Sequence, residues 1–381
     1  MAQTPAKAPV RPLSGIFKGV KYAVNEPFIT GALLYILTRG PADIRGRILG
    51  PFRTNLLSKN GTQRLAKLIT ALKWLTAIGV AKRINLGLNR LALNNWTFGR
   101  PGAPFEFGPS KRELVVITGG SSGFGYEMVK LFANKARVIV LDVSPFPDEL
   151  ARLSDVYFYR CDVTDTPAVV NLCDEIRKTH GNPSVLINNA GIGIGKTVLE
   201  TSNEQCEKLF QVNLISHFVL IREFLPDMLK MKKGHIVTIA SMASFHAAPG
   251  LLDYCCSKVG ALYLNDGIRA ECLTRYPGGE GICTTSVHPS WHQTGILNST
   301  VTKTLQKHGI VPDPAINVSK LVVDQVLAAR SGRLHVPLSE ESKSGIRYWP
   351  MWYQDMMMGY VFPKSKKGFE FGKDKDSKLS E

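Results

Sequence analysis

The stretch ELVVITGGSSGFG, residues 113–125, decides the fold. Its first six residues are mostly apolar or β-branched, which predicts a buried strand. A glycine-rich turn follows, and the pattern beyond it predicts a helix from about Tyr126. Glycines let backbone N–H groups approach a phosphate, and the amino end of a helix favours its negative charge. The stretch therefore predicts a pyrophosphate site, although its G-x-x-x-G-x-G spacing differs from the commoner G-x-G-x-x-G.

Short apolar runs alternate with longer amphipathic stretches beyond this turn. Strands are predicted at 113–118, 137–142, 156–162, 184–191, 234–241 and 282–289. Helices are predicted at 166–181, 202–230 and 253–273. Such alternation is typical of a parallel sheet covered on both faces, so the predicted fold class is α/β, a Rossmann-type doubly wound parallel sheet. Ligands of such sheets bind beyond the carboxyl ends of the strands.

The chain separates into three regions that differ in composition and in apolar pattern. Residues 1–108 are basic with apolar patches, and we expect a helical, membrane-associating extension there. Residues 109–338 contain the alternating pattern and are expected to form the dinucleotide-binding catalytic domain. Residues 339–381 are an aromatic- and Met-rich segment that ends in a Lys-rich tail.

Positive charge is concentrated at the amino end. The 381 residues have a formal net charge of +16. Residues 1–100 contain sixteen Lys and Arg but only two acids, Glu26 and Asp43, so this segment alone carries +14. An anionic partner, either a lipid headgroup surface or a nucleic acid, is therefore expected for it.

The seven cysteines indicate free thiols in a reducing compartment. Their number is odd, they form no C-x-x-C motif, and most lie in apolar or periodic segments, where we expect them to be buried. Residues 1–15 show no charged-then-apolar signal pattern, so an intracellular location is expected.

Polar side chains stand at the ends of three predicted strands. Asp142 closes the second strand, where a carboxylate can accept hydrogen bonds from an adenosine ribose and repels a 2′-phosphate. No Lys or Arg lies in 119–125 or directly after Asp142, so NAD is favoured, with NADP left open. The alternative is that Asp142 caps the following turn. Asp162 and Asn189 follow the third and fourth strands, where they would either meet the cofactor or stabilise turns.

The spacing Tyr-x-x-x-Lys occurs three times, and on a helix it places both side chains on one face. The pair at 360–364 encloses Pro363, which prevents that helix. The pair at 126–130 follows the glycine turn, where we expect the tyrosine to pack or to face solvent. Neither pair is expected to do chemistry.

The third pair, Tyr254 and Lys258, begins the helix after the fifth strand, and Ser241 ends that strand. These three side chains can converge at the carboxyl edge of the sheet. A free tyrosine titrates at about pH 10. A nearby ammonium favours the phenolate, so we expect Lys258 to lower the pKa of Tyr254 and to make it an acid–base catalyst.

The motifs TGGSSGFG, LDV, CDV, NNAG, QVN, IVTIAS and YCCSK occur in this order across the α/β region. In order and spacing the region resembles the short-chain dehydrogenase/reductase family. It is most similar to the retinol and hydroxysteroid dehydrogenase-like branch, which acts on lipophilic alcohols. The similarity to that branch rests on the basic extension, on residues 313–337 and on the aromatic carboxyl-terminal segment.

The resemblance implies an NAD(P)-dependent alcohol dehydrogenase or reductase. Tyr254 would exchange a proton with the substrate oxygen while a hydride moves to or from the cofactor. Ser241 would hydrogen-bond that oxygen, and Lys258 would also hold the nicotinamide ribose. The resemblance further implies that Asn213 anchors a water in the proton path; the alternative is an amide that bonds its own helix backbone.

The resemblance also implies a set of cofactor contacts from the glycine turn and the strand ends. They are Gly119, Ser121, Ser122, Gly123, Phe124, Gly125, Asp142, Asp162, Val163, Asn189, Ala190, Tyr254, Lys258, Pro289 and Thr294. The family usually has Pro-Gly after the sixth strand. Here Ser290 replaces that glycine, and its extra Cβ can alter the loop.

Two apolar stretches of the basic segment are too short or too charged to cross a bilayer. Residues 27–38, as a helix, are too short to cross a hydrocarbon core of about 30 Å. Residues 65–81 carry Lys67 and Lys73, and a central lysine costs roughly 2.5–3.5 kcal/mol in a span. We therefore expect a helix that lies in the membrane interface, with 347–367 as a second contact. The alternatives are packing on the core or a homodimer interface; nucleic acid ranks third, since no recognition motif is present.

The predicted function is hydride transfer between NAD(P) and a lipophilic alcohol or carbonyl, retinoid-, steroid- or polyketide-like, at an endoplasmic reticulum or lipid-droplet membrane. Two alternatives stay open, a catalytically idle nucleotide-binding scaffold at membranes and a soluble cytoplasmic ketoreductase of secondary metabolism. The intact catalytic set favours the enzyme. His288 and His292 straddle Pro289 without a third ligand, so no metal is expected.

Overall fold

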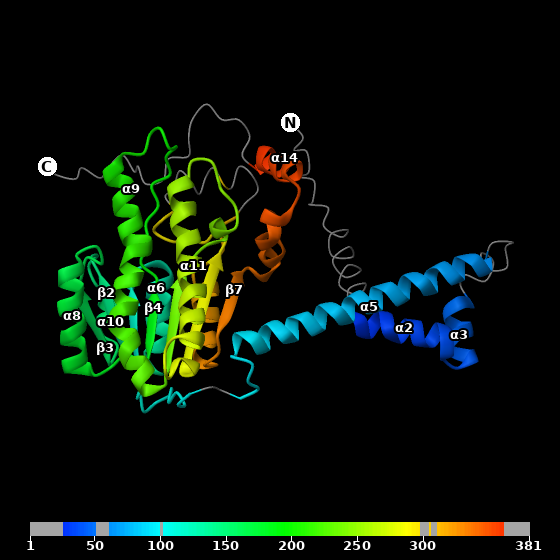
Figure 1. Cartoon of the computed structure of the whole chain (residues 1–381), viewed down its shortest axis with the longest axis horizontal. Helices are drawn as coiled ribbons and strands as arrows, with labels where there is room; N and C mark the ends of the chain where they lie inside the picture. Colours follow the sequence, from blue (N-terminus) through cyan, green and yellow to red (C-terminus); the bar gives the residue numbers. More distant parts are fainter. Residues whose placement is uncertain (1–25, 51–60, 100–101, 298–304, 306–310, 362–381) are drawn as a thin grey trace, which may run out of the picture. The chain divides into compact units, whose positions relative to one another are not determined.

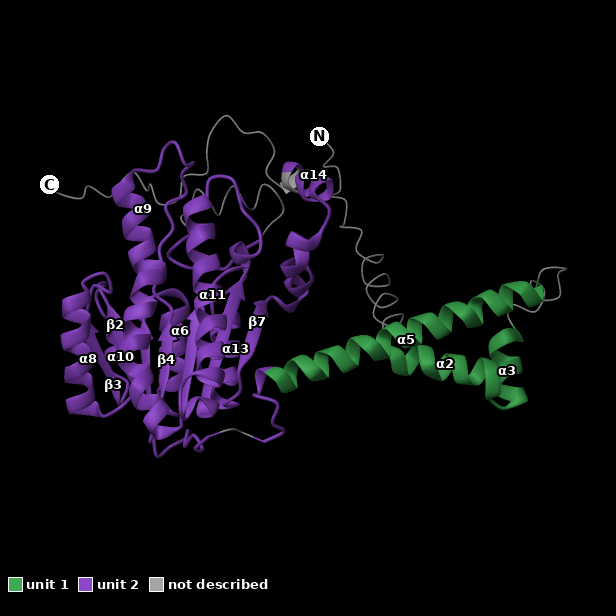
Figure 2. Cartoon of the chain, viewed as in Figure 1, with its two compact units in different colours: residues 1–92 green, residues 93–381 purple. Residues whose placement is uncertain are grey.

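The structure is a computed structural model, and it describes residues 26–50, 61–99, 102–297, 305 and 311–361. The chain divides into two compact units, residues 1–92 and 93–381 (Figure 2). The first unit is helical, and the second contains the sheet and the candidate site.

Seven parallel strands form the sheet of the second unit, in the order β3-β2-β1-β4-β5-β6-β7 (Figure 1). The strands are β1 Leu114–Thr118, β2 Arg137–Asp142, β3 Val156–Arg160, β4 Val185–Asn188, β5 Gly234–Ile239, β6 Ile282–Pro289 and β7 Gly332–Val336. The strand order reverses between β1 and β4, which confirms the predicted doubly wound Rossmann-type fold. Ligand sites in such sheets lie at this reversal, beyond the carboxyl ends of the strands.

The strand β7 lies outside the six strands predicted from the sequence. It pairs in parallel with the second half of β6. Its sequence, GRLHV, has only two apolar residues, Leu334 and Val336, and only its last two residues are buried, so the sequence signal for this strand is weak. Its position matters for the site, because it holds the chain just after β6.

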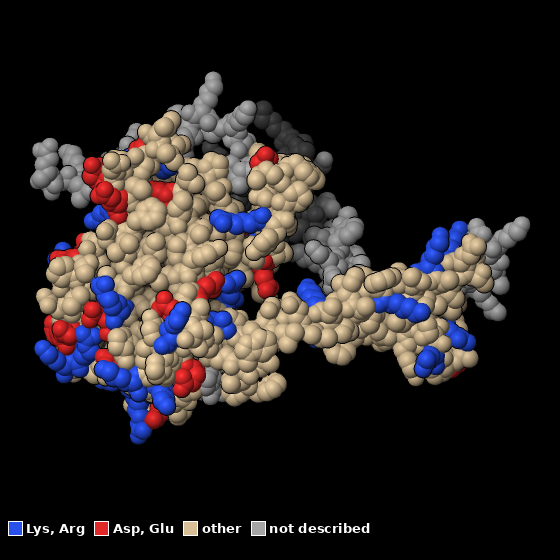
Figure 3. Space-filling model, viewed as in Figure 1, with Lys and Arg blue, Asp and Glu red and all other residues tan. Residues whose placement is uncertain are grey.

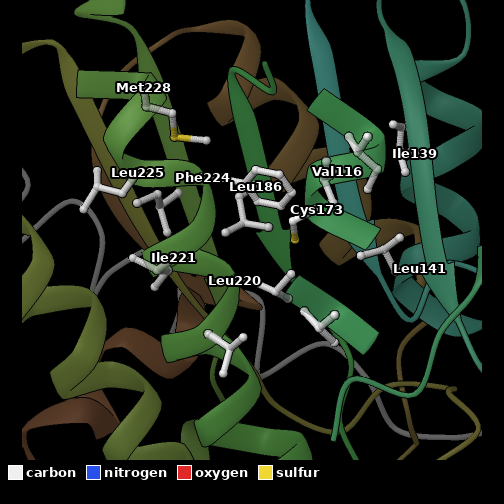
Figure 4. Close-up of a cluster of buried hydrophobic side chains, with 14 of the residues drawn as sticks. Val116, Ile139, Leu141, Cys173, Leu186, Leu220, Ile221, Phe224, Leu225 and Met228 are labelled. Atoms are coloured by element: carbon white, nitrogen blue, oxygen red, sulfur yellow. The ribbon is translucent and has the colours of Figure 1, made fainter. Parts of the chain in front are cut away.

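Helices cover both faces of the sheet, and each interface is a buried apolar cluster. On one face lie α8 (Thr166–His180), α10 (Ser216–Met231) and α11 (Leu252–Thr274); on the other lie α6 (Gly123–Phe132) and α13 (Ile316–Leu327). Figure 4 shows the first cluster, where α10 side chains meet those of the strands. The labelled residues are Val116, Ile139, Leu141, Cys173, Leu186, Leu220, Ile221, Phe224, Leu225 and Met228. Because helices cover both faces of the sheet, ligands are expected at the carboxyl ends of its strands.

The long helix predicted at 202–230 is interrupted. It consists of α9 (Asn203–Phe210), a π-helical turn η2 (Gln211–Ile215) and α10. Single π turns inside helices are rare and are frequently found at functional sites. This one contains Asn213.

The remaining elements of the second unit are short or terminal. They are α7 Asp148–Ala151, η3 Met242–Ser244, η4 Gly279–Gly281, η5 Leu338–Tyr348 and α14 Met351–Val361. Five cysteines are buried as predicted, but Cys256 is exposed and Cys206 is half-buried. Cys256 differs because it lies on the outer side of α11, next to the buried Cys255.

The first unit contains α2 (Pro27–Arg39), α3 (Ala42–Leu49) and α5 (Gly61–Leu93). The predicted helical character of the extension is confirmed, but α5 continues well beyond 65–81 in both directions. Among the described residues, every helix is too short or too polar to cross a membrane.

Candidate active site

The glycine-rich turn joins β1 to α6 at the carboxyl edge of the sheet. Gly119 and Gly123 have φ angles of +66° and +54°, which favour glycine. A Cβ on Gly125 would lie 2.1 Å from the carbonyl oxygen of Gly119, so the backbone packs too closely for any side chain. The helix begins at Gly123, before the predicted start near Tyr126, because the Tyr126 N–H already bonds the Ser122 carbonyl at 3.1 Å.

Two features of this turn fit a pyrophosphate. Ser121 Oγ is buried and has no hydrogen-bond partner among the described residues. Ser122 is the N-cap of α6, and its side chain makes no capping hydrogen bond. A hydroxyl and a helix amino end are thus available to an anion, and the residues present fit a dinucleotide.

Asp142 ties β2 to the glycine turn. Its carboxylate accepts from the Ser121 N–H and from the Ser144 N–H, both at 2.9 Å, and the residue is 8% exposed. Asp142 therefore caps the turn that follows β2, which was the alternative interpretation of this residue from the sequence. A carboxylate offers about four acceptor positions, so these two bonds leave capacity for a ribose hydroxyl.

Asn189 binds the glycine turn to the exit of β4. Its Nδ2 donates to the carbonyl oxygens of Thr118 and Gly119 at 2.8 and 2.9 Å. Thr118, which the sequence did not single out, accepts from the N–H groups of Asn189 and Ala190 at 3.0 Å. The sequence signal that could have identified Thr118 is its place at the end of a central strand. A hydroxyl there can accept hydrogen bonds from backbone N–H groups just after the neighbouring strand.

Asp162 stabilises a turn after β3. Its Oδ1 accepts from the N–H and the hydroxyl of Thr164 at 2.9 and 2.8 Å. These bonds, the backbone one first, lower the pKa of Asp162. Val163 beside it is buried.

Tyr254 and Lys258 lie one turn apart on α11, next to the end of β5. Lys258 is 2% exposed, and its Nζ donates to the Ile239 carbonyl at 2.8 Å and lies 5.6 Å from the centroid of the Tyr254 ring. The Ser241 hydroxyl is close enough to Tyr254 to oppose, by hydrogen bonding, part of the rise in the Tyr254 pKa that burial causes. The structure therefore brings together the three side chains that the spacing predicted.

Burial, however, dominates the titration of this pair. It raises the pKa of Tyr254 to about 12, against the hydrogen bond with Ser241, and it lowers the pKa of Lys258 to about 8. The prediction that Lys258 and the positive nicotinamide together lower the pKa of Tyr254 stays a prediction, since the protein by itself raises this pKa through desolvation of the phenolate. The protonated phenol is thus the stable form at neutral pH.

The pair Tyr126 and Lys130 is not in the site. Tyr126 donates to Glu149, and Lys130 pairs with the same carboxylate at 2.7 Å on the surface of α6. Lys364, of the pair at 360–364, lies outside the described residues.

Asn213 is fully buried and connects the π turn to the loop after β4. Its Oδ1 accepts from the Ile192 N–H at 2.8 Å, and its Nδ2 donates to the Ile192 carbonyl at 2.9 Å and to Ser257 Oγ at 3.1 Å. The amide therefore bonds another loop rather than its own helix. Both donors are used, which leaves one lone pair of Oδ1 for the predicted water.

The loop after β4 runs from the glycine turn to Tyr254. A Cβ on Gly191 would lie 3.4 Å from both Lys258 Nζ and Asn213 Oδ1, and one on Gly193 would lie 3.8 Å from the Tyr254 ring. The backbone of this loop therefore passes close to both Tyr254 and Lys258.

The chain after β6 also lies close to Ser241 and to the glycine turn. Ser290 continues the pairing with β7, since its N–H donates to the Val336 carbonyl at 2.8 Å. Thr294 lies against the glycine turn, where a Cβ on Gly123 would be 3.5 Å from its side chain. Pro289 accepts a long hydrogen bond of 3.5 Å from the Ser241 hydroxyl.

A group of aromatic rings behind Ser241 escaped the sequence prediction. His288 Nδ1 lies 3.2 Å from the Ser241 carbonyl oxygen, and its ring stacks on His335 with centroids 5.2 Å apart. Phe245 packs against both rings. The sequence offered His288 as a metal ligand candidate, whereas its buried place at the end of β6 makes it a neighbour of Ser241.

A cavity of about 340 Å³ opens beside the segment that follows Ser241. Its lining is Phe245, His246, Ala247, Ile346, Arg347, Met351, Gln354 and Asp355. A second cavity of about 230 Å³ shares His246, Ala247 and Arg347 with it. The carboxyl-terminal elements η5 and α14 thus form one wall of this space.

Comparison with known proteins assigns the class. Residues 113–304 match the family model of the short chain dehydrogenases, and the chain belongs to that family. Dehydrogenase RED2 of Cochliobolus heterostrophus is 35% identical over 203 residues, which are 53% of this chain and 74% of the relative. Epidermal retinol dehydrogenase 2 of Mus musculus is 35% identical over 223 residues, 56% of this chain and 71% of the relative.

A solved structure agrees with the fold. A short chain dehydrogenase/reductase from Burkholderia phymatum in complex with NAD superimposes with a TM-score of 0.56 at 23% identity, covering 69% of this chain and 100% of that one. The predicted family, with its retinol and hydroxysteroid dehydrogenase-like branch, is confirmed. The protein is an oxidoreductase of the short-chain dehydrogenase family that uses a nicotinamide dinucleotide.

Proposed function

We propose that this enzyme transfers a hydride between NAD and a lipophilic alcohol or its carbonyl counterpart, with Tyr254 as the acid–base group. The observation that carries the proposal is the loop after β4. Its Asn189 binds the glycine turn, and its Gly191 and Gly193 lie next to the buried Lys258 and the half-buried Tyr254. This arrangement supports a nicotinamide ring laid next to the phenol.

Each residue has a role that follows from its contacts. The bound dinucleotide would accept or deliver the hydride. In reduction, the protonated Tyr254 donates its proton to the carbonyl oxygen and becomes a phenolate; in oxidation the Tyr254 phenolate takes the alcohol proton and becomes the neutral phenol. Ser241 holds the reacting oxygen by a hydrogen bond, so that Tyr254 and the substrate stay aligned.

Lys258 and Asn213 support the proton transfer. Lys258 is fixed by its hydrogen bond to the Ile239 carbonyl and is proposed to hold the nicotinamide ribose as well. Its charge, added to that of the oxidised cofactor, opposes the burial that raises the pKa of Tyr254. Asn213 is proposed to hold a water through its remaining acceptor, as a route to solvent for the proton.

The preference for NAD over NADP is proposed from Asp142. A buried carboxylate at the end of β2 repels a 2′-phosphate and can accept a bond from a ribose hydroxyl. The remaining contacts predicted from the sequence, from Gly119 to Gly125 and at Pro289 and Thr294, are proposed to hold the phosphates and the nicotinamide edge.

The substrate class is proposed from the relatives and from the cavity walls. One relative is named a retinol dehydrogenase and another a 17-beta-hydroxysteroid dehydrogenase. Phe245, Ile346 and Met351 are apolar residues in the wall of the cavity next to residues 245–247, which also has polar and charged lining residues. A retinoid-, steroid- or polyketide-like molecule suits such walls.

We also propose an intracellular location at an endoplasmic reticulum or lipid-droplet surface, in a monomer or homodimer. The +14 charge of residues 1–100 supports it. Removal of residues 1–105 should release the enzyme from sedimented membranes, and a full chain that stays in the supernatant would point to the soluble alternative.

The catalytic proposal is tested with Tyr254→Phe and a panel of retinoid, sterol and polyketide alcohols and ketones. The variant should bind NADH as the wild type does, yet lose roughly 10²–10⁴-fold in turnover. Turnover is followed by the absorbance of the reduced nicotinamide. Wild-type turnover in the variant would remove Tyr254 from the mechanism, and cofactor binding without turnover on any substrate would favour the idle scaffold.

A further inference from the structure

The first unit has an inverted distribution of residue types. The residues that α2 and α5 bury are Pro27, Thr30, Leu37, Gly61, Leu72 and Gly79, half of them small or polar. The exposed large apolar side chains are Phe28, Ile29, Tyr35, Leu68, Trp74, Ile78, Val80, Ile84, Leu86 and Leu88. Helices in water bury their large apolar side chains, whereas small and hydroxyl residues between helices with apolar outer surfaces are typical of packing in lipid.

The two helices are joined by close contacts of this kind. Thr76 Oγ1 donates to Thr30 Oγ1 at 3.1 Å, and a Cβ on Gly79 would lie 3.1 Å from the Pro27 ring. Pro27 meets Gly79, and Thr30, further along α2, meets Thr76, which comes earlier in α5. The two helices are therefore antiparallel at the contact. Figure 2 shows them diverging from it toward α3.

Exposed charge on the described residues of this unit is mostly basic, with Asp43 of α3 as an exposed acid. Glu26, the acid that precedes α2, forms an ion pair with Arg83. Lys67, Lys73 and Lys82 on α5 are exposed. Figure 3 shows basic side chains spaced along otherwise uncharged surface in this unit. A second copy of the same basic surface would be repelled, whereas an anionic surface would be attracted.

The charges also define how deep the unit can enter a bilayer. Between Lys73 and Lys82 the helix α5 has eight uncharged residues, about 12 Å at 1.5 Å per residue, well short of a hydrocarbon core of about 30 Å. Lysine and arginine can reach the headgroups while their neighbours enter the lipid. The unit therefore suits the plane of the interface rather than a span.

We propose that α2 and α5 together are a preassembled docking surface for an anionic phospholipid membrane, with the exposed apolar side chains of both helices inserted below the phosphates. The proposal rests on the membrane location given above and extends it, because α2, and not only the α5 segment, contributes inserted side chains. Phe28, 73% exposed at the start of α2, and Ile78, 58% exposed in the uncharged part of α5, are its leading contacts.

The test is vesicle sedimentation of the full-length chain with phosphatidylcholine vesicles, with and without phosphatidylserine. Phe28→Glu and Ile78→Glu should each reduce vesicle binding roughly tenfold or more, the change expected when one large apolar contact is lost. Thr38→Glu is the matched control on α2, because Thr38 is exposed and polar. Leu321→Glu, on the 43% exposed Leu321 of α13, controls for the second unit. Both controls should bind nearly as the wild type does.

The outcomes separate this inference from the proposed function. If Phe28→Glu binds as tightly as Thr38→Glu, α2 is not part of the surface and the inference fails, while the membrane location stands. If the wild type dimerises in sedimentation velocity without vesicles and Phe28→Glu abolishes the dimer, the surface joins copies of the chain and the inference fails. Equal turnover in wild type and Phe28→Glu with a water-soluble substrate shows that the fold and the active site are intact.

Discussion

The backbone N–H of Ser121 donates to the carboxylate of Asp142 at 2.9 Å, and this bond joins the glycine turn to the end of β2. One carboxylate thus shapes the turn that is proposed to hold the phosphates and stands where the ribose is expected. Cofactor affinity and cofactor choice are therefore coupled through a single side chain.

Substitution of Asp142 should separate these two effects. Asp142→Ala removes the carboxylate oxygens that accept from the Ser121 and Ser144 N–H groups, and it removes the charge, so we expect weaker binding of both cofactors and a smaller preference for NAD. Asp142→Asn keeps one acceptor oxygen, and it should lose the preference with less loss of affinity. The measurement is KM for NAD and NADP with each variant. An unchanged NAD to NADP ratio in both would place the ribose contact elsewhere.

The close backbone approach in the glycine turn gives a second prediction. In Gly125→Ala the new Cβ would lie 2.1 Å from the Gly119 carbonyl oxygen, so the turn must shift and NADH binding should fall by at least tenfold. Gly267→Ala is the matched control, because a Cβ there meets nothing within 4 Å. Calorimetric titration with NADH measures both. Tight binding by Gly125→Ala would show that the turn does not hold the dinucleotide.

The sequence predicts most of the sheet because its strands are rich in apolar, aromatic and β-branched residues. Residues 282–289 and 137–142 were placed with the bounds that the structure has. The edge strand β7, GRLHV, has only two apolar residues and was missed. The π turn was missed for a different reason. The side chain of Asn213 bonds the backbone of Ile192, and sequence periodicity carries no information on that distant contact.

The same limit applies to the candidate site. The four-residue spacing was enough to place Tyr254 beside Lys258, because a helix fixes that geometry. The direction of the Tyr254 pKa shift depends on how much water the whole fold removes, and spacing does not show this. The hydrogen bonds of Thr118 depend on the register of β1 and β4, which only the assembled sheet defines.

Buried histidines make stability depend on pH. Burial lowers the pKa of His217, His235 and His288 to about 3 from 6.5. Above pH 6.5 these groups are neutral in both states and have no effect. Below it the unfolded chain binds three more protons than the folded chain, so the free energy of unfolding falls by about 1.4 kcal/mol per histidine for each pH unit until about pH 3.

Denaturant unfolding between pH 7 and 5 measures this slope. His235→Gln should reduce the proton uptake on unfolding by one, since glutamine can keep a bond to Thr285 without titrating. A free energy of unfolding that stays constant down to pH 5 would contradict the buried neutral state of these rings.

The contact between α2 and α5 gives the last prediction. Gly79 lies at that contact, where a Cβ would be 3.1 Å from the Pro27 ring, whereas a Cβ on Gly87 of the same helix meets nothing within 4 Å. Leucine favours a helix over glycine at either position by roughly 0.5–1 kcal/mol. Gly79→Leu also forces a larger side chain into the contact, which costs about 1–3 kcal/mol. Amide hydrogen exchange of residues 27–39 should therefore accelerate in Gly79→Leu and stay unchanged in Gly87→Leu. Equal protection in both variants would mean that α2 is not held by α5.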